Sequence, residues 1–193
     1  MIRNIKIISL VVILLSLCIM FFLTINDRYD INVQNEIIDN VFSMEITDGD
    51  DNLLRDFLNF KSVSYIDESY LGYIYIPRFN IKRIIKFGTD DDVLNAGYVG
   101  MHKLSGALDN DDLIILAGHN ISNVFSKLHS ISIGDFIYIN TKKISRKFVV
   151  YDKQVVSEYD INYLENNRNK ELLLITCTKV SGERLLVFLK EEL

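Results

Sequence analysis

The chain has 193 residues, of which 49% are hydrophobic, with a single proline and a formal net charge of −5 at pH 7. This length and composition allow one modest domain with an appendage, and the apolar content excludes a disordered chain. The acidic balance argues against nucleic acid or anionic lipid as a binding partner.

The first predicted element is a transmembrane anchor. Residues 7–25 (IISLVVILLSLCIMFFLTI) carry no charge and would form a helix about 28 Å long, which nearly matches a hydrocarbon core of about 30 Å. A cleaved signal peptide is the alternative, but its apolar region is usually shorter and ends in small residues, unlike MFFLTINDRYD here. Because Arg3 and Lys6 precede the span, we expect residues 1–6 to stay in the cytoplasm and the rest to be exported.

Export changes how the charges and the cysteines are interpreted. Leaving Arg3 and Lys6 out of the 21 basic residues leaves 19 against 26 acidic ones, a formal charge of −7 for the exported part. Cys18 lies inside the predicted span, so Cys177 has no cysteine partner within the exported part. A lone thiol outside the cytoplasm is expected to pair with another chain or to be reactive.

Residues 26–69 are predicted to form an extracellular stalk that is partly helical. The segment is polar, and Ile37, Ile38 and Val41 have the spacing of a short amphipathic helix. The sequence DGDD at 48–51 lacks the further ligands and the closing glutamate of a calcium-binding loop. A solvated turn is the preferred interpretation of these aspartates.

From residue 70 to residue 193 the sequence predicts a small all-β domain. Its apolar runs are YIYI before Pro77, IKRIIKF, DLIILAG, DFIYIN, RKFVVYDKQVV, ELLLITC and RLLVFLK, separated by Gly, Asn and Asp. Seven or eight strands, several of them apolar on both faces, favour a closed barrel over an open sheet. The connections ISNVFSKLHSI and DINYLENN are predicted to be short helices, too few for an α/β fold.

Cys177 ends one of these strands. If 171–177 and 184–190 form an antiparallel hairpin around the loop TKVSGE, Cys177 lies directly opposite Arg184, on the same face, with Cβ atoms about 5 Å apart. A neighbouring cation favours the thiolate form of a thiol, whereas a purely structural cysteine gains nothing from an arginine. The same register also predicts the pairs Ile175–Leu186 and Leu173–Phe188.

A cysteine nucleophile also needs a group that exchanges protons. His119 closes the predicted strand LIILAGHN, where Gly118 permits a tight backbone turn and lets another chain approach. Histidine is the usual choice because it titrates near neutral pH. His129 in a helical connection and His102 in a glycine-bearing loop are weaker candidates. A histidine at a strand end is more often structural, and the Cys–Arg pair is what favours catalysis here.

The order of these motifs resembles the sortase family, the membrane-anchored cysteine transpeptidases of Gram-positive bacterial surfaces. AGHN, SNVFSKL, IGDFIYI, and ITC followed by RLLVF lie in the order that this family has, within about residues 70–193. The resemblance implies an eight-stranded barrel with His119, Cys177 and Arg184 as its catalytic residues. The family's usual T-L-x-T-C is LLITC here, so Leu173 replaces the first threonine.

The resemblance also implies a mechanism without a metal or cofactor. Cys177 attacks a peptide carbonyl in a C-terminal sorting signal resembling LPxTG, on a surface protein, and forms a thioester. His119 protonates the leaving amine, and an amine of a peptidoglycan precursor or a pilin subunit then takes the acyl group. Arg184 stabilises the oxyanion or holds the substrate backbone. A zinc site is disfavoured because the exported part has one cysteine.

The subclass and two alternative functions follow from the same residues. Only 14 residues separate Val156 from Glu171, too few for the insertion that class B sortases carry, so we expect a class A- or D-like enzyme. An extracellular thiol peptidase or hydrolase would use the same three residues. A catalytically idle, membrane-anchored binding module is the alternative that is not an enzyme.

Overall fold

The computed structural model describes residues 2–41, 69–164 and 168–192. The first element is helix α1 (Ile2–Val41), one continuous helix of 40 residues. The chain divides into two compact units, residues 1–34 and 35–193, and the second contains every strand.

Helix α1 runs through the predicted anchor and into the predicted stalk without a break. Within the part of the chain that the structure describes, no helix is long and apolar enough to cross a membrane. The anchor over residues 7–25 and the boundaries of the flanking segments stay predictions. Residues 42–68, with the DGDD turn and most of the predicted stalk, lie outside the described residues.

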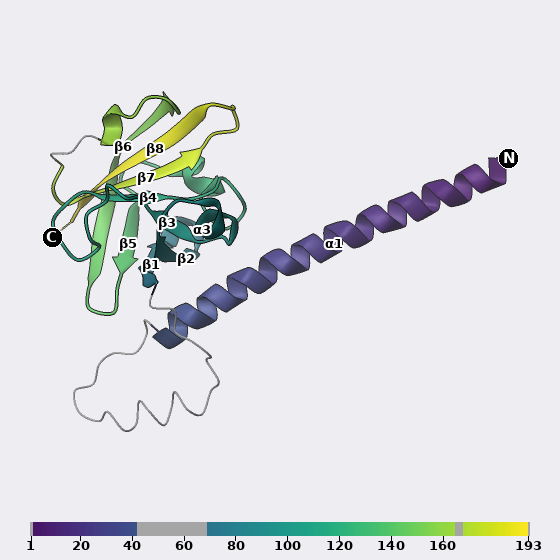
Figure 1. Cartoon of the computed structure of the whole chain (residues 1–193), viewed down its shortest axis with the longest axis horizontal. Helices are drawn as coiled ribbons and strands as arrows, with labels where there is room; N and C mark the ends of the chain where they lie inside the picture. The colour runs from purple at the N-terminus through teal and green to yellow at the C-terminus, as the bar shows by residue number, and fades with distance from the viewer. Residues whose placement is uncertain (1, 42–68, 165–167, 193) are drawn as a thin grey trace, which may run out of the picture. The chain divides into compact units, whose positions relative to one another are not determined.

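Eight strands close into a barrel in the order β1-β2-β3-β4-β7-β8-β6-β5, which confirms the predicted all-β architecture (Figure 1). Their bounds are β1 Tyr70–Ile76, β2 Ile81–Phe87, β3 Val99–Met101, β4 Ile114–Ala117, β5 Phe136–Asn140, β6 Ser145–Ser157, β7 Glu171–Cys177 and β8 Glu183–Glu191. The helical elements between them are η1 Pro77–Phe79, α3 Asp91–Asn95, η2 Ser126–Ser130 and η3 Asn162–Leu164. In the part of each predicted helical connection that the structure describes, one short 3-10 helix is present, η2 in the first and η3 in the second.

The sequence interpretation missed β3 and α3. Strand β3 has three residues around Gly100, too few to show a hydrophobic period, and it was assigned to a loop. It pairs parallel with β2 and antiparallel with β4, so it completes the barrel. A side chain at Gly100 would overlap the carbonyl oxygen of Gly88, which is why this short strand needs a glycine.

Strands β4, β7 and β8 are apolar on both faces because each face has its own cover. Their inward residues join the barrel core, which includes Leu116, Leu174 and Val187. Their outward residues form a second cluster, here called the outer cluster, made of Leu113, Ile115, Leu173, Ile175, Leu186 and Phe188. Tyr163 and Leu164 of η3 pack on the outer cluster. Full burial of one such side chain stabilises the fold by about 2 kcal/mol.

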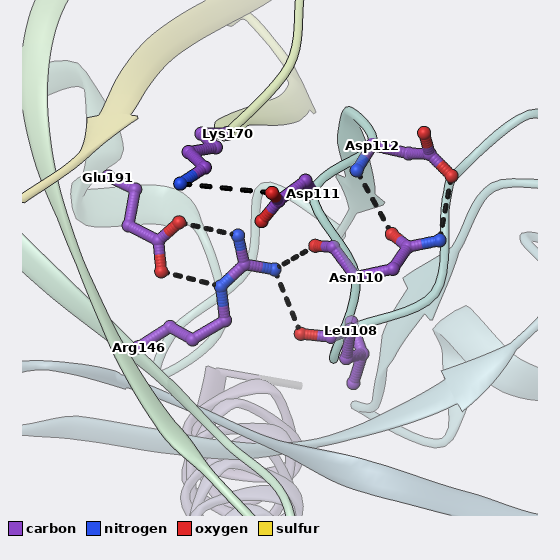
Figure 2. A network of polar contacts seen from close by, with 7 residues as sticks. All are labelled: Leu108, Asn110, Asp111, Asp112, Arg146, Lys170 and Glu191. Carbon is purple, nitrogen blue, oxygen red and sulfur yellow. Dashed lines mark hydrogen bonds and ion pairs between the residues drawn. The ribbon is translucent and has the colours of Figure 1, made fainter. Parts of the chain in front are cut away.

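Arg146 on β6 anchors the long connection between β3 and β4 (Figure 2). Its Nε and Nη2 atoms each donate to the Glu191 carboxylate at 2.7 Å. Its Nη1 atom donates to the carbonyl oxygens of Leu108 at 3.1 Å and Asn110 at 2.5 Å. The hydrogen bonds between Arg146 and Glu191 raise the pKa of Arg146 and lower the pKa of Glu191. The contacts join strand β6, the C-terminal end of β8 and the connection into one rigid corner.

Lys170 ties the start of β7 to the same corner. Its backbone N–H donates to the Asp111 carbonyl at 2.7 Å, and its ammonium lies 3.7 Å from the Asp111 carboxylate. The Lys170 carbonyl accepts from the backbone N–H of Glu191 at 2.8 Å. Because β7 begins here and ends at Cys177, this corner fixes the strand at the end away from the cysteine.

Candidate active site

The β7–β8 hairpin places Cys177 directly opposite Arg184, as predicted from the length of its loop. The pairs Ile175–Leu186 and Leu173–Phe188 are confirmed as well. In the loop, Gly182 has a φ of +81°, a conformation that glycine adopts at little cost, and Thr178 N–H donates to the Glu183 carbonyl at 3.2 Å. The thiol and the guanidinium therefore end the same face of two neighbouring strands.

His119 reaches the same edge of the sheet through strand β4. This strand runs parallel to β7 with Ala117 beside Ile175, and Gly118 N–H donates to the Ile175 carbonyl at 3.0 Å. Parallel neighbours end at the same edge, and His119 and Cys177 each lie two residues beyond the last pair. With the strand order β4-β7-β8 (Figure 1), the imidazole, the thiol and the guanidinium come from three adjacent strand ends.

Gly118 is needed for space rather than for an unusual backbone angle. A Cβ atom built on Gly118 would lie 2.6 Å from the ring of Phe125, which is fully buried in the barrel core. The backbone N–H of Phe125 in turn donates to the His119 carbonyl at 3.1 Å. Phe125 of the same chain thus packs closely against Gly118 and fixes the backbone that carries the histidine, whereas the predicted approach of another chain stays a prediction.

The three residues lie at the end of the outer cluster. Cys177 shares a strand face with Ile175 and Leu173, and Arg184 shares one with Leu186 and Phe188, because side chains alternate along a strand. All three candidate residues are half-buried. The three residues thus lie on the outward face of the barrel wall, at the end of the buried outer cluster.

Arg184 has an acidic partner that the sequence interpretation missed. Its Nη2 atom lies 2.9 Å from the Glu158 carboxylate, and its Nη1 atom donates to the Glu183 carbonyl at 3.1 Å. Glu158 follows strand β6 directly, and its N–H donates to the Gly182 carbonyl at 2.8 Å. The contact follows from the pairing of β6 with β8, which places Val156 opposite Arg184. The β7–β8 hairpin alone does not indicate this pairing.

Tyr163 covers the outer cluster close to Arg184. Burial raises the pKa of Tyr163, the charge of Asp160 adds to this effect, and the charge of Arg184 opposes it. The tyrosine therefore stays neutral at physiological pH. Its carbonyl accepts a hydrogen bond from Arg168, whose guanidinium stacks 5.1 Å from the centre of the Phe188 ring. These contacts hold η3 on the outer cluster.

A hollow of about 460 Å³ opens beside this edge. Its lining includes Val156, which pairs with Arg184, together with Tyr163 and Phe188 of the outer face. The hollow therefore lies over the outer faces of β6 and β8, and none of His119, Cys177 and Arg184 lines it.

Asn95 is a second contact that sequence reasoning missed. Its Oδ1 atom lies 2.9 Å from His119 Nε2, although 24 residues separate the two in the chain. Asn95 ends the five-residue helix α3, which lies between β2 and β3. Since α3 has no hydrophobic period of its own, no local pattern indicated this contact.

The other two histidines make no hydrogen bond to His119, Cys177 or Arg184 within the described residues. His102 Nδ1 accepts a hydrogen bond from the Leu104 N–H at 3.2 Å, and burial together with the charge of Lys103 lowers the pKa of His102. Nε2 of His129, in η2, is buried without a hydrogen-bond partner in the described part of the chain. Among the described residues, no group of three or more His, Cys, Asp or Glu side chains could hold a metal ion.

Comparison with known proteins gives consistent matches. A family model described as "Sortase domain" matches residues 74–192, more than half of the chain. Sortase A of Listeria monocytogenes is 24% identical over 121 residues, which cover 61% of this chain and 54% of the relative. Among solved structures, sortase C1 of Streptococcus agalactiae is 26% identical with a TM-score of 0.61, covering 87% of this chain and 91% of that one. Sortase C of Clostridium perfringens is 28% identical with a TM-score of 0.59, covering 85% and 86%.

The match to the Listeria relative spans about half of that protein's length. The two structural matches extend over most of both chains. Because the similar proteins include a sortase A and two sortases C, the class A- or D-like character expected from the short β6–β7 connection stays a prediction.

Proposed function

The chain belongs to the sortase family, and on that premise we propose that it is a cysteine transpeptidase with Cys177 as its nucleophile. The observation that carries this proposal is the arrival of His119, Cys177 and Arg184 at three adjacent strand ends. A nucleophile, a group that exchanges protons and a donor for developing negative charge are the parts that acyl transfer needs.

The proposed reaction has two halves. Cys177 Sγ attacks the carbonyl carbon of a peptide bond, an S–C bond forms, and the tetrahedral intermediate collapses to a thioester as the C–N bond breaks. His119 gives its proton to the departing amine. A second amine then attacks the thioester, loses a proton to His119 and releases the thiolate. The net result exchanges one amine for another without water, metal or redox change.

Arg184 is proposed to hold the substrate carbonyl and its oxyanion. Its guanidinium has five N–H donors in a fixed plane, of which the contacts to Glu158 and Glu183 use one on each terminal nitrogen. The ion pair with Glu158 fixes the plane, and the other N–H groups, which have no hydrogen bond among the described residues, are proposed to bind an oxygen atom near Cys177. Donors held in place before the reaction stabilise the transition state without reorganisation.

The proposed substrates are surface proteins with a C-terminal sorting signal that resembles LPxTG. The family match and the half-buried, partly accessible side chains of His119, Cys177 and Arg184 support binding of such a segment. The acceptor is an amine of a peptidoglycan precursor or of a pilin subunit. We place the domain of residues 70–193 outside the cell, on a stalk of residues 26–69 and an anchor of residues 7–25, with residues 1–6 in the cytoplasm.

A product analysis tests the transpeptidase against its alternatives. The full chain in detergent micelles is incubated with a library of sorting-type peptides, with and without an added small amine, and the products are separated by mass. A transpeptidase forms the ligated amide only when the amine is present. Hydrolysed peptide alone, at all amine concentrations, would identify an extracellular thiol hydrolase. If no product forms and alkylating reagents do not label Cys177, the protein is a catalytically idle binding module.

A further inference from the structure

Strand β6 is much longer than the strand that flanks it on one side. Strand β5 pairs with residues 145–149 of β6, whereas β8 pairs with β6 as far as Ser157. Over its last residues, the edge of β6 that faces away from β8 therefore has no partner strand in the described part of the chain. Such an edge presents N–H and C=O groups to which another polypeptide can bind.

The direction of these backbone groups follows from a hydrogen bond at the end of β6. Alternate residues of a strand turn their backbone groups to opposite sides. The Glu158 N–H donates to the Gly182 carbonyl, which lies on the β8 side. Residues with the opposite parity, Lys153, Val155 and Ser157, therefore turn their backbone groups toward the open edge.

Some of these groups are satisfied within the chain. The Asp152 carboxylate accepts from the Lys153 N–H at 2.8 Å, and the Ser157 carbonyl accepts from the Asp160 N–H at 3.0 Å. The Lys153 C=O, both backbone groups of Val155 and the Ser157 N–H have no such hydrogen bond among the described residues. Val155 is 57% exposed, so the centre of this edge is open to solvent.

The preceding part of the same edge is protected. The pairing of β6 with β8 is irregular between Val150 and Asp152, and the Lys153 ammonium donates to the Ile131 carbonyl at 2.6 Å. Bulges and charged side chains are two of the means by which proteins keep other chains off a sheet edge. This protection ends before Val155, so the open groups are confined to the last turn of the pleat.

The open edge lies level with the candidate active site. Val156 pairs with Arg184 across β6 and β8, and Arg184 pairs with Cys177 across β8 and β7. Neighbouring strands lie about 4.8 Å apart, so a strand added to β6 would run about 14 Å from β7. About four extended residues span that distance. A polypeptide held at Cys177 can therefore reach the open edge.

We infer that the end of β6 binds the polypeptide substrate as an added strand, upstream of the carbonyl that Cys177 attacks. Unpaired main-chain donors and acceptors in a row are satisfied by an extended peptide, which adds affinity through its own main chain. The upstream segment remains attached as the thioester after the downstream fragment has left, so its binding serves both halves of the reaction. This inference rests on the proposed function, because it assigns a second contact to the substrate proposed there.

The expected effect is on substrate affinity. A neutral hydrogen bond shifts an equilibrium by about fivefold. With two or more such bonds, less the cost of ordering the segment, we expect about a tenfold lower Kd for a peptide that reaches the edge. The short probe is the peptide LPETG. The long probe has about eight alternating threonine and valine residues before it, which favour an extended conformation.

The test measures Kd for both probes with the full-length Cys177→Ala protein in micelles, which lacks the proposed nucleophile. The extension is also N-methylated at every second residue, in each of the two possible registers. Only alternate N–H groups of an added strand face β6. One methylated register should therefore lose the tenfold gain in affinity, and the other should keep it.

A proline substitution in the same protein tests the edge itself. Proline has no N–H and is tolerated on an edge strand where that N–H faces solvent, so Val155→Pro should remove the gain. Ile133→Pro is the matched control and should keep it. Ile133 is 69% exposed and precedes Gly134, whose φ is +91°, a turn position that accepts proline. Thermal melts report whether each variant keeps its fold.

Three results would overturn the inference. The first is an equal Kd for the short and the long probe. The second is an equal loss of affinity in both methylated registers, because the segment would then not bind as a strand. The third is a dimer that sedimentation detects and that Val155→Pro abolishes, since a second copy of the chain would then occupy the edge. Ligation by the parent in any of these cases would leave the proposed function intact. A Kd that depends on peptide length without ligation would refute the transpeptidase and retain the edge.

Discussion

Replacing Arg184 by lysine separates the geometry of its side chain from its charge. Lysine keeps the positive charge and can still pair with Glu158, which lies 2.9 Å from the arginine. It cannot also reproduce the Nη1 contact to the Glu183 carbonyl and offer further N–H groups in the same plane. The substitution therefore tests whether the proposed oxyanion donor needs the planar fork.

The expected loss follows from the number of donors removed. Loss of one aligned donor to an oxyanion costs about 3 kcal/mol in the transition state, so kcat/KM of Arg184→Lys should fall by about a hundredfold. Thermal stability should change little, because the side chains of Arg184 and Glu158 are 30% and 32% exposed and such pairs contribute less than about 1 kcal/mol. Peptide ligation assays and thermal melts measure the two quantities.

A matched control makes the same chemical change elsewhere. Arg78 Nη1 donates to the two carboxylate oxygens of Asp135 at 3.0 and 2.9 Å. Arg78 lies in η1, remote in sequence from the candidate site. Arg78→Lys should leave kcat/KM unchanged. If Arg184→Lys turned over peptide within about threefold of the parent, a range far below the expected loss, the fork would not be needed and the proposed role of Arg184 would be wrong.

Gly118→Ala should destabilise the domain by about 1–3 kcal/mol in urea unfolding, because its Cβ would lie 2.6 Å from the Phe125 ring, and an unchanged midpoint would contradict this. The pKa of Glu191 is lowered from 4.5 in the folded state by the hydrogen bonds from Arg146, so its stabilising contribution is present above the unfolded value and is lost as the pH falls through the folded one. The free energy of unfolding of the parent should therefore fall more steeply below about pH 4.5 than that of Glu191→Gln. An equal pH dependence in the two proteins would refute the assignment. Protease added to intact protoplasts should digest the chain beyond residue 26, and complete protection would contradict the predicted anchor.

The hairpin of the site was predictable because its information is local. The ends of the apolar runs 171–177 and 184–190 fix the loop length, and a loop length fixes which residues are opposite one another. Cys177 and Arg184 were therefore paired correctly before any three-dimensional information. The closed barrel also followed from local evidence, since strands that are apolar on both faces need a cover on each side.

The supporting residues were not predictable in the same way. Asn95 lies on a helix of five residues and meets His119 only because β3 completes the barrel next to β4. Glu158 meets Arg184 because β6 flanks β8 on the side away from β7. Both contacts depend on strand order, which no single apolar run contains. Strand β3 itself, with three residues, is below the length at which alternation can be recognised.

The measurement that tests the central claim most directly is the intact mass of the protein during turnover. The full chain is mixed with a sorting-type peptide and stopped with acid, and the mass and position of any acyl adduct are determined. We expect an adduct on Cys177 that disappears when an amine is added, is lost in Cys177→Ala and persists in Cys18→Ala, with an unchanged thermal melt in all three proteins. Ligation that survives in Cys177→Ala, or an adduct on another residue, would contradict Cys177 as the nucleophile.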